Sequence, residues 1–362
     1  MSASGPGGAG GAAPAPRRIY VTDCEGPLTK NDNAQEIAAR FIPDGAEFFA
    51  RLSKYDDFLA DVVHKPGYNA GDTLRLLPPF LKAFAVTDED VEAFSAEGVL
   101  LVPGALQMLD ETAALLPTFI ISTSYTPYLK ALCALTGFPL DHVSCTELSL
   151  DAWQMPDDEI AWLRDEAVRV MERGLIEIPC EASSAADLSP VDTVTVARLD
   201  DLFWAQMAGR VSGALVAAVR PVGGGMKLAA LEEIVAAEGV EGVGVMYVGD
   251  SITDAPPLAA VKAWGGVSLS FNGNGYALAA AEFAAASPDA GVAAELAKAF
   301  AGGGRDGVEA AVHAWPKPEE GETPAGRALA RVGLVAEEPE ALAEASAAAR
   351  RSVRGARIAR LG

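Results

Sequence analysis

Histidine, cysteine and basic residues are scarce in this sequence. Its 362 residues include 3 His and 4 Cys, and 28 Lys and Arg stand against 50 Asp and Glu, so the formal net charge is −22. The Cys residues have no Cys-X-X-Cys spacing and no cluster of His beside them, which argues against a zinc site and favours a reduced, cytoplasmic chain. The negative charge attracts neither nucleic acid nor an anionic membrane surface, so we expect no partner of either kind.

Long hydrophobic runs are also absent. The apolar stretch at 239–249 is short and rich in glycine, and the alanine-rich stretch at 276–300 is interrupted by acids, lysine and proline. Because a membrane-spanning helix needs roughly 20 consecutive apolar residues, we expect no transmembrane segment. Residues 1–17 lack the basic start and the continuous apolar core of a secretion signal, so we expect a disordered Gly/Ala/Pro tail there.

Half of the residues are hydrophobic, which is enough for one large core or for a core with a smaller domain. Four short apolar runs have the composition of buried strands, and each ends in polar or turn residues: 19–21, 117–122, 243–249 and 264–271. Helical patterns separate these runs, which indicates an α/β fold with a doubly wound, Rossmann-like parallel sheet. In such sheets, the functional site lies at the carboxyl ends of the strands.

Two long helical stretches interrupt the strand pattern. Residues 33–97 show helical spacing and predict an inserted helical domain, so that the core would consist of 18–32 and 98–316. Residues 146–225 are also mainly helical, and we expect them to extend the core. Residues 317–362 predict a linker and a C-terminal helix, whose acidic start and basic end suit the helix dipole.

Asp23 and Glu25 lie where the first strand ends, in the segment IYVTDCEGPLTKND. Gly26 and Pro27 force a turn there, so both acids are presented at the carboxyl end of a buried strand rather than buried within it. The alternative is a helix-capping Asp in an ordinary strand-to-helix turn, because such turns favour Asp for its hydrogen bonds.

Three later features supply what a carboxylate nucleophile needs to attack a phosphoryl group. Ser122 follows the second strand and suits a phosphoryl oxygen, with a helix N-cap as the alternative. Lys227 follows three glycines that allow close backbone approach, with a solvated lysine as the alternative. Asp250 and Asp254 lie four residues apart at a strand-to-helix turn and form a hard oxygen site, for which magnesium is the natural ion. Without a cation, repulsion between these two acids would remain uncompensated.

Taken together, these motifs resemble those of the haloacid dehalogenase superfamily. Its members carry a strand ending in Asp-X-Asp, a strand ending in Ser or Thr, a Lys, and a strand ending in paired acids. The chain has DCEGP, ISTSY, GGGMK and GDSITD in that order, between Arg18 and Asn274. The segment STSYTPYL and the helical insertion are similar to the phosphoserine phosphatase branch, in which the insertion is a cap domain. DCEGP and ISTSY are also similar to the group known as subunit R of energy-converting hydrogenase A.

The resemblance implies a catalytic role for four residues. Asp23 would be the nucleophile that forms an aspartyl-phosphate. Glu25 would protonate the leaving oxygen and later activate water. Ser122 and Lys227 would bind the phosphoryl oxygens.

The resemblance also implies a magnesium cofactor. Asp23, the backbone carbonyl of Glu25 and Asp250 would hold the ion, and Asp254 would bind it directly or through water. A carboxylate cannot attack a phosphate dianion unless charge is screened, and the ion and Lys227 would perform this screening.

Glu25 departs from the superfamily, whose phosphatases usually have Asp at this position. The ordinary pKa values are close, about 4.3 for Glu against about 3.9 for Asp, but the Glu side chain is one methylene longer. Three functions stay open: a magnesium-dependent phosphatase acting on a small phosphomonoester, a non-catalytic or weakly active accessory protein that binds a phospho-ligand, and a phosphomutase. Dehalogenation fits less well, because it needs neither the metal pair nor the proton donor.

Substrate contacts are expected from the second motif and from the helical insertion. The candidates are Thr123, His64, Lys65, Tyr68 and Arg75. A surface loop between helices is the alternative for the insertion residues. A cap that closes over the site excludes solvent and favours a small phosphorylated metabolite over a polymer. The sequence leaves a homo-oligomer open.

Overall fold

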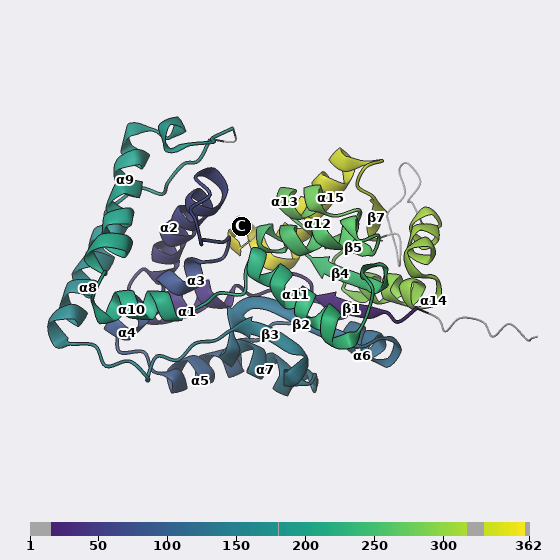
Figure 1. Ribbon diagram of the computed structural model, residues 1–362, viewed down its shortest axis with the longest axis horizontal. Helices are drawn as coiled ribbons and strands as arrows, with labels where there is room; N and C mark the ends of the chain where they lie inside the picture. Colours follow the sequence, from purple (N-terminus) through teal and green to yellow (C-terminus); the bar gives the residue numbers. More distant parts are fainter. Residues whose placement is uncertain (1–15, 180, 317–328, 359–362) are drawn as a thin grey trace, which may run out of the picture.

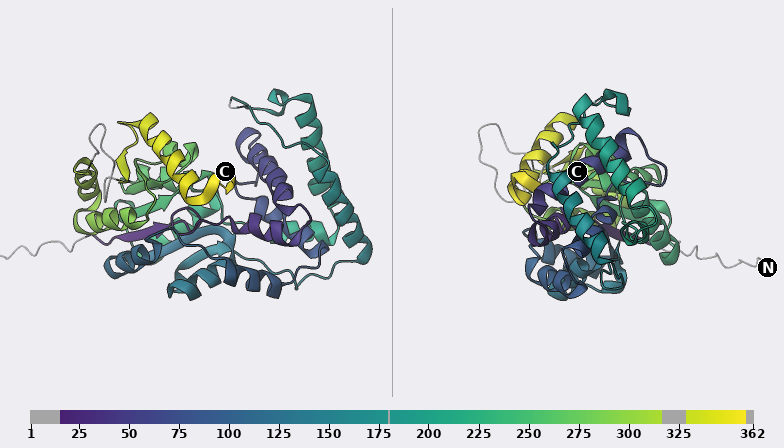
Figure 2. Two further views of the ribbon diagram at one scale, coloured as in Figure 1. Left: turned by 180° about the vertical axis from the view of Figure 1, so that it is seen from behind. Right: turned by 90° about the vertical axis from the view of Figure 1, so that its left-hand side faces the viewer.

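The computed structural model describes residues 16–179, 181–316 and 329–358. They form a sheet covered by helices and, beside it, a lobe made of helices alone (Figure 1). Views from two other directions show the same separation (Figure 2). Most of the expected N-terminal tail, the linker before the C-terminal helix and Cys180 lie outside the described residues.

The sheet confirms the predicted α/β architecture. Its seven strands in the described residues are β1 (Ile19–Thr22), β2 (Thr118–Tyr125), β3 (Val143–Thr146), β4 (Val245–Gly249), β5 (Val267–Phe271), β6 (Phe283–Ala286) and β7 (Arg331–Leu334). They lie in the order β3-β2-β1-β4-β5-β6-β7, and every neighbouring pair is parallel except β6 and β7. The order reverses between β1 and β4, and doubly wound sheets bind ligands outside the carboxyl ends of the strands at such a reversal.

Three of these strands are not predicted by the sequence pattern: β3, β6 and β7. Each has only four residues, which leaves little room for a recognisable pattern. β6 consists of Phe283 followed by three alanines, and it lies in an alanine-rich region that reads as helix. β2 is also longer than expected, because it continues past Ser122 to Tyr125.

Fifteen helices lie in the described ranges. They are α1 (Asn33–Phe41), α2 (Gly45–Asp57), α3 (Thr73–Leu76), α4 (Pro78–Ala83), α5 (Asp88–Gly98), α6 (Ala105–Leu115), α7 (Thr126–Thr136), α8 (Asp157–Met171), α9 (Pro190–Asp200), α10 (Val211–Ala218), α11 (Gly225–Glu238), α12 (Ala255–Ala263), α13 (Gly275–Ala280), α14 (Gly291–His313) and α15 (Pro339–Ile358). Shorter turns of helix are η1 (Phe58–Val62), η2 (Leu140–His142), η3 (Ala185–Asp187), η4 (Asp201–Gln206), η5 (Gly242–Gly244) and η6 (Ile252–Asp254). None of the helices that the structure describes has both the length and the hydrophobicity of a membrane span.

Helices cover both faces of the sheet. Neighbouring side chains of a strand point to opposite faces, so Tyr20 and Val21 of β1 enter different clusters. Tyr20 packs in the cluster that contains Phe300 of α14 and residues of α6 and α7. Val21 packs in the cluster that contains Leu231 of α11 and residues of α12 and α13. Because both faces are covered, the polar ends of the strands are the part of the sheet left for a site.

The second helical stretch does not extend the sheet core as expected. Its helices α8, α9 and α10 pack with α1 to α4 in one hydrophobic cluster, which we call the helical lobe together with α5. Tyr55 of α2 and Phe203 of η4 stack with ring centroids 6.0 Å apart. The second stretch packs on the first because other helices already cover both faces of the sheet, so the apolar faces of the two helical stretches cover each other. Thr87 caps the start of α5, where its side chain and that of Asp90 form a reciprocal pair of hydrogen bonds.

Candidate active site

The turn after β1 lies against the loop that follows β4. Asp23 is buried, and its Oδ1 accepts a hydrogen bond from the backbone amide of Cys24 at 2.7 Å. Gly26 has a φ of +107°, and a Cβ at this position would lie 2.2 Å from Asp250 Oδ2. Only glycine permits both the backbone angle and this approach. The first and fourth motifs therefore meet at the reversal of the strand order.

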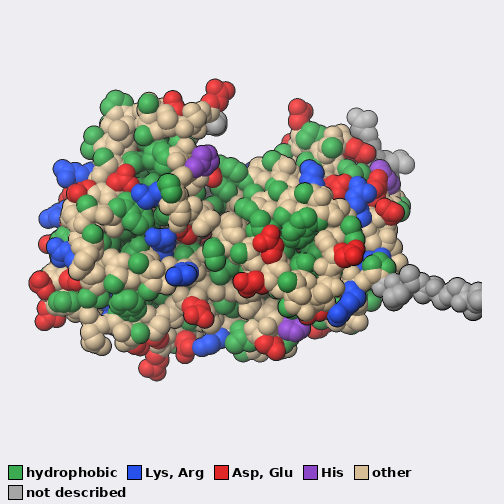
Figure 3. Space-filling model, viewed as in Figure 1, with side chains coloured by type: hydrophobic (Ala, Val, Ile, Leu, Met, Phe, Trp, Pro, Cys, Tyr) green, Lys and Arg blue, Asp and Glu red, His purple; other side chains and the backbone are tan. Residues whose placement is uncertain are grey.

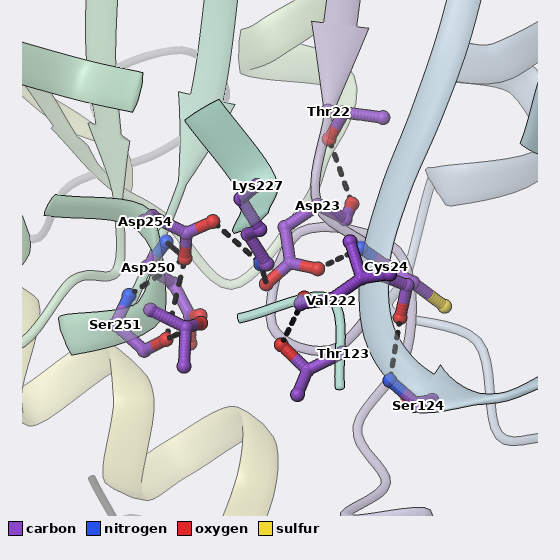
Figure 4. A network of polar contacts seen from close by, with 12 residues as sticks. Thr22, Asp23, Cys24, Thr123, Ser124, Val222, Lys227, Asp250, Ser251 and Asp254 are labelled. Carbon is purple, nitrogen blue, oxygen red and sulfur yellow. Dashed lines mark hydrogen bonds and ion pairs between the residues drawn. The ribbon is translucent and has the colours of Figure 1, made fainter. Parts of the chain in front are cut away.

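Lys227 joins Asp23 to Asp254 (Figure 4). Its Nζ lies 2.8 Å from Asp23 Oδ2 and 2.7 Å from Asp254 Oδ1, and all three side chains are buried. Burial by itself lowers the pKa of Lys227, but the two carboxylates outweigh it and hold the pKa above its ordinary value. Lys227 is thus a charged bridge inside the site and not a solvated lysine at a helix start.

Both carboxylate oxygens of Asp254 are engaged by donors. Oδ1 accepts from Lys227 and, at 2.8 Å, from the Tyr247 hydroxyl, while Oδ2 accepts from the backbone amides of Asp250 and Ser251 at 3.0 and 3.1 Å. Burial raises the pKa of Asp254, but Lys227 and these hydrogen bonds lower it below its ordinary value. A carboxylate has about four acceptor positions, so these donors occupy them. The contacts suit a residue that orients Lys227.

Asp250 is paired with two arginines of the C-terminal helix. Its Oδ2 accepts a hydrogen bond from Arg350 Nη1, and Arg354 Nη1 lies 3.2 Å from the same oxygen. Arg350 also donates to the backbone carbonyl of Asp250 at 3.2 Å. Asp250 and Asp254 therefore need no metal to relieve their repulsion, because Lys227 pairs with Asp254 and the two arginines pair with Asp250.

Three carboxylates are close enough to share a cation. Oxygen atoms of Asp23, Asp250 and Asp254 lie within 4.8 Å of one another, and all three residues are buried. Such hard oxygen donors fit the expected magnesium ion. Since Asp254 is engaged elsewhere, Asp23 and Asp250 are the residues that fit best as direct ligands. Burial and the charge of Asp254 raise the pKa of Asp23 while Lys227 lowers it, and a bound cation would act in the same direction as Lys227.

Glu25 lies at the boundary between the sheet and the helical lobe. Its Oε1 accepts a hydrogen bond from the backbone amide of Asn33, the first residue of α1, at 2.7 Å. Removal from water and the neighbouring Asp32 raise the pKa of Glu25 to about 8, although Arg354 and the Asn33 amide oppose this shift. A carboxyl group with such a pKa holds its proton at neutral pH, which is the state that a general acid requires.

Ser122 and Thr123 lie where β2 passes beyond its last pair with β1. Ser122 is fully buried, and its Oγ accepts from the backbone amide of Ser124 at 3.2 Å. Thr123 donates its hydroxyl proton to the carbonyl of Val222 at 3.0 Å, which ties β2 to the segment before α11. Ser122 caps no helix, because α7 begins only at Thr126.

A cavity of about 120 Å³ lies between the sheet and the helical lobe. In the space-filling view, the surface is hollowed where the two parts meet (Figure 3). The predicted residues that line the cavity are Asp23, Glu25, Ser122, Thr123 and Asp250. From the helical lobe, it is lined by Phe49, Ser53, Asp56, Asp57, Gly71, Thr73 and Leu74. The first, second and fourth motifs thus share one cavity, and Lys227 lies behind its wall.

The four candidate contacts from the helical insertion are not brought into this cavity. His64 is exposed, and its Nδ1 is 2.8 Å from the carbonyl of Ala60. The other three gather around Trp204: Lys65 Nζ lies 4.8 Å and the Arg75 guanidinium 5.4 Å from its ring, and Tyr68 meets it edge-on at 6.1 Å. In this structure, these residues stabilise the lobe from within, and Ser53, Asp56 and Thr73 face the cavity in their place.

The glycines before Lys227 serve the contact with the helical lobe. Gly223 approaches the lobe so closely that a Cβ would lie 2.4 Å from the carbonyl oxygen of Ala70. Gly224 has a φ of +49° and faces Asn69 and Ala70. The backbone at these glycines therefore makes a close approach, as expected, and the segment that it approaches is the helical lobe at Asn69 and Ala70.

Five charged residues of the site were not predicted from the sequence: Asp32, Asp56, Asp57, Arg350 and Arg354. All five line the cavity. Asp32 lies one residue before α1 and accepts from the amide of Gln35, as the N-cap of that helix. The two arginines lie four residues apart, and this spacing on a helix with several basic residues was a visible signal. From the sequence alone, the helix dipole is a sufficient explanation for basic residues at this end of a helix.

Comparisons with known proteins include an extensive structural likeness. The gene product AF1437 from Archaeoglobus fulgidus is 29% identical, with a TM-score of 0.79, and the match covers 96% of this chain and 99% of that chain. Two phosphoserine phosphatase structures, a phospho-aspartyl intermediate analogue and a substrate complex, match at 14% and 13% identity; each covers 74% of this chain and 92% of its own, with a TM-score of 0.43. No protein-family model matches the sequence, and no curated protein does. The first likeness spans nearly the full length of both chains, so it includes the helical lobe as well as the sheet.

Proposed function

We propose that this protein is a magnesium-dependent phosphatase of the haloacid dehalogenase type, which hydrolyses a small phosphomonoester through an aspartyl-phosphate on Asp23. The observation that carries the proposal is the Lys227 bridge, which fixes Asp23 in the wall of a cavity that Asp250 and Ser122 also line. The motifs occur along β1, β2, α11 and β4 in the order of that superfamily, and their side chains converge at the reversal of the sheet.

The first step transfers the phosphoryl group to the protein. A carboxylate oxygen of Asp23 attacks the phosphorus atom, and the ester P–O bond breaks. Glu25 gives its proton to the departing oxygen, so that the product leaves as an alcohol. Lys227 holds the Asp23 carboxylate in position and offsets negative charge as the substrate approaches.

The second step releases phosphate. Glu25, now ionised, takes a proton from a water molecule whose oxygen attacks the phosphorus atom. The bond between phosphorus and Asp23 breaks, inorganic phosphate leaves, and Glu25 is protonated again. Ser122 and the backbone amides near it face the phosphoryl oxygens in both steps.

Magnesium, when bound, would supply a Lewis acid that neutralises charge on the phosphoryl oxygens. Asp23 and Asp250 would hold it, because their oxygens lie close together and are the donors that this ion prefers. The helical lobe would act as a cap, since Phe49 and Leu74 close the cavity with apolar groups that exclude water.

A panel of phosphate esters, assayed with magnesium, tests this function. We expect Asp23→Asn to lower turnover by more than about a thousandfold, because it removes the nucleophile. The matched control is Asp306→Asn, which alters an acid that is 97% exposed. Magnesium should also raise the melting temperature of the unaltered protein, and less so that of Asp250→Asn. Turnover that survives in Asp23→Asn would contradict the proposal.

A phospho-ligand-binding accessory protein is the second candidate. Two observations favour it: Asp250 is paired with Arg350 and Arg354, and Glu25 is bonded to the Asn33 amide, so both acids are engaged within the protein. Phosphate binding without turnover of any ester, together with a stable partner complex, would support it. Turnover that requires Asp23 would count against it. Including acceptor alcohols in the panel detects the transfer between hydroxyls that a phosphomutase performs.

A further inference from the structure

The C-terminal segment reaches the site because of the direction of β7. This strand pairs antiparallel with β6, with Arg331 opposite Ala286 and Leu334 opposite Phe283. β7 therefore starts at the carboxyl edge of the parallel strands and ends at their amino edge. α15 then runs back along the sheet, and at about 1.5 Å per residue it is long enough to return to the carboxyl edge. Figure 2 shows its last described turns where the sheet meets the helical lobe.

α15 is a packed helix of the fold. Leu342 is fully buried against Leu278 and Ala284, and Ser346 is also fully buried. Arg350 follows at the same spacing and is 5% exposed. Residues four apart lie along one face of a helix, so the face that packs on the sheet continues directly into Arg350 and then Arg354. The fold thus delivers both guanidinium groups to the cavity at fixed positions.

The cavity has more negative charge than Lys227 can offset. Six acidic side chains line it, and four remain when Glu25 and Asp56 hold protons, whereas Arg350 and Arg354 are the basic residues that line it within the described part of the chain. Lys227 lies behind the wall and already pairs with Asp23 and Asp254. Without the two arginines, a phosphate dianion that enters the cavity would therefore meet an unfavourable electrostatic potential.

Both arginines contact Asp250, and Arg354 is also bound to the segment before α1. Arg354 is held by the protein, because it donates from Nε to the carbonyl of Lys30 at 3.3 Å, from Nη2 to the carbonyl of Asn31 at 2.5 Å, and from Nη1 to Asp250. Its guanidinium is thus tied to the segment that leads into the helical lobe. Arg350 donates from Nη1 to the carbonyl and to the carboxylate of Asp250. Arg350 therefore lies beside the proposed metal ligand and on the cavity wall.

We propose that Arg350 is a phosphate-binding residue of this site, supplied by the C-terminal helix. The inference rests on the proposed function, because it assigns a contact to the phosphoryl group of that substrate. A guanidinium can keep its bond to Asp250 and still direct a second N–H toward a phosphoryl oxygen, since it has five donors in a planar fork. A positive charge beside Asp250 weakens the binding of a metal cation there. The same charge strengthens the binding of a phosphate anion, which offsets this loss.

Calorimetric titration of the full-length protein with inorganic phosphate, in the presence of magnesium, tests the proposal. We expect Arg350→Gln to weaken phosphate binding by at least about tenfold, the effect of losing one charge-assisted contact. Arg351→Gln is the matched control, because Arg351 is on the same helix and exposed, and it should bind phosphate like the unaltered protein. A separate titration with magnesium alone should show that Arg350→Gln binds the ion at least as tightly as before.

Two results would overturn the proposal. One is an unchanged phosphate affinity in Arg350→Gln. The other is a parallel loss of magnesium affinity, because Arg350 would then act only by positioning Asp250. If Arg350→Gln does not fold, Arg350→Lys decides: it keeps a charge but not the fork, and phosphate binding should fall to an intermediate value. Phosphate binding requires no turnover, so an absence of esterase activity would contradict the proposed function and leave this inference standing.

Discussion

The Glu25 carboxyl group accepts a hydrogen bond from the backbone amide of Asn33, at 2.7 Å, where the first helix of the helical lobe begins. Glu25 also lines the cavity, so one side chain connects the turn after β1, the lobe and the proposed substrate. The Glu side chain is one methylene longer than that of Asp, which extends the reach of its carboxyl group. The hydrogen bond to the Asn33 amide fixes the orientation of this side chain, which could not be predicted from the sequence.

Glu25→Gln separates proton donation from this structural contact. Gln still accepts from the Asn33 amide but has no acidic proton, so we expect turnover of an alkyl phosphate to fall by about a hundredfold or more. In the first step, release of p-nitrophenol from p-nitrophenyl phosphate should slow much less, because this leaving group departs without a proton. Single-turnover rates of leaving-group release from the two esters measure the difference, since loss of the base slows the second step for both esters alike, and Glu25→Asp is the control that retains an acid. Equal losses for both esters would show that Glu25 does not act as the general acid.

Asp254→Asn should destabilise the fold, because it removes one of two negative partners of a fully buried lysine. Breaking a buried ion pair in this way costs about 3–5 kcal/mol. Urea unfolding measures the change in the free energy of unfolding. Asp306→Asn is the control, and a substitution at such an exposed position usually changes stability by less than about 0.5 kcal/mol. Similar values for the two variants would mean that the bridge contributes little.

Asp56 should make stability depend on pH. Burial and the nearby Asp57 raise its pKa well above the ordinary value, so the folded protein holds a proton that the unfolded chain has lost. This contribution to stability is complete below the unfolded pKa of about 3.9, and it falls by about 1.4 kcal/mol per pH unit as the pH rises toward the folded pKa.

Urea unfolding at pH 5 and pH 8 measures this dependence. Asp56→Asn keeps an acceptor for the Gly71 amide, which lies 2.9 Å from Asp56 Oδ2, but it does not titrate. The variant should therefore lose less stability than the unaltered protein between the two pH values. Equal losses would show that Asp56 titrates near its ordinary pKa.

Gly223→Ala should separate the helical lobe from the sheet. A Cβ at this position would lie 2.4 Å from the carbonyl oxygen of Ala70, which is backbone and cannot easily move aside. A displacement of about 1 Å between groups that face one cavity can cost a hundredfold in rate, so we expect kcat/KM to fall while the melting temperature changes little. Gly302→Ala is the control, because no atom lies within 4 Å of its added Cβ. Unchanged kcat/KM in Gly223→Ala would show that this contact does not position the lobe.

Local patterns in the sequence were sufficient for the sheet strands that carry the site. Ile19, Val21 and Tyr247 are buried β-branched or aromatic residues in short runs, and such runs are typical of parallel strands covered on both faces. Asp23 and Asp250 follow these runs directly, so their convergence could be predicted from the carboxyl-end rule. β6 could not be predicted in this way, because a strand of alanines is defined by its neighbours β5 and β7 rather than by its own composition.

The contents of the cavity were harder to predict. Lys65, Tyr68 and Arg75 have the polar and aromatic character of ligand contacts, but Trp204 lies more than 120 residues along the chain and gathers them inside the lobe. Asp56 and Thr73, from α2 and α3, line the cavity instead. Which face of a lobe helix points to the site depends on what covers its other face, and no local pattern contains this information.

Residue chemistry and spacing along the chain were enough to identify the α/β architecture and the acids, hydroxyl and lysine that gather at one end of the sheet. These features depend on strand periodicity and on turns, which act over a few residues. The tertiary structure alone joined Arg350 to Asp250, 100 residues away, and combined the two helical stretches into one lobe. Such long-range contacts depend on the path of the whole chain, here on an antiparallel edge strand that turns α15 back toward the site.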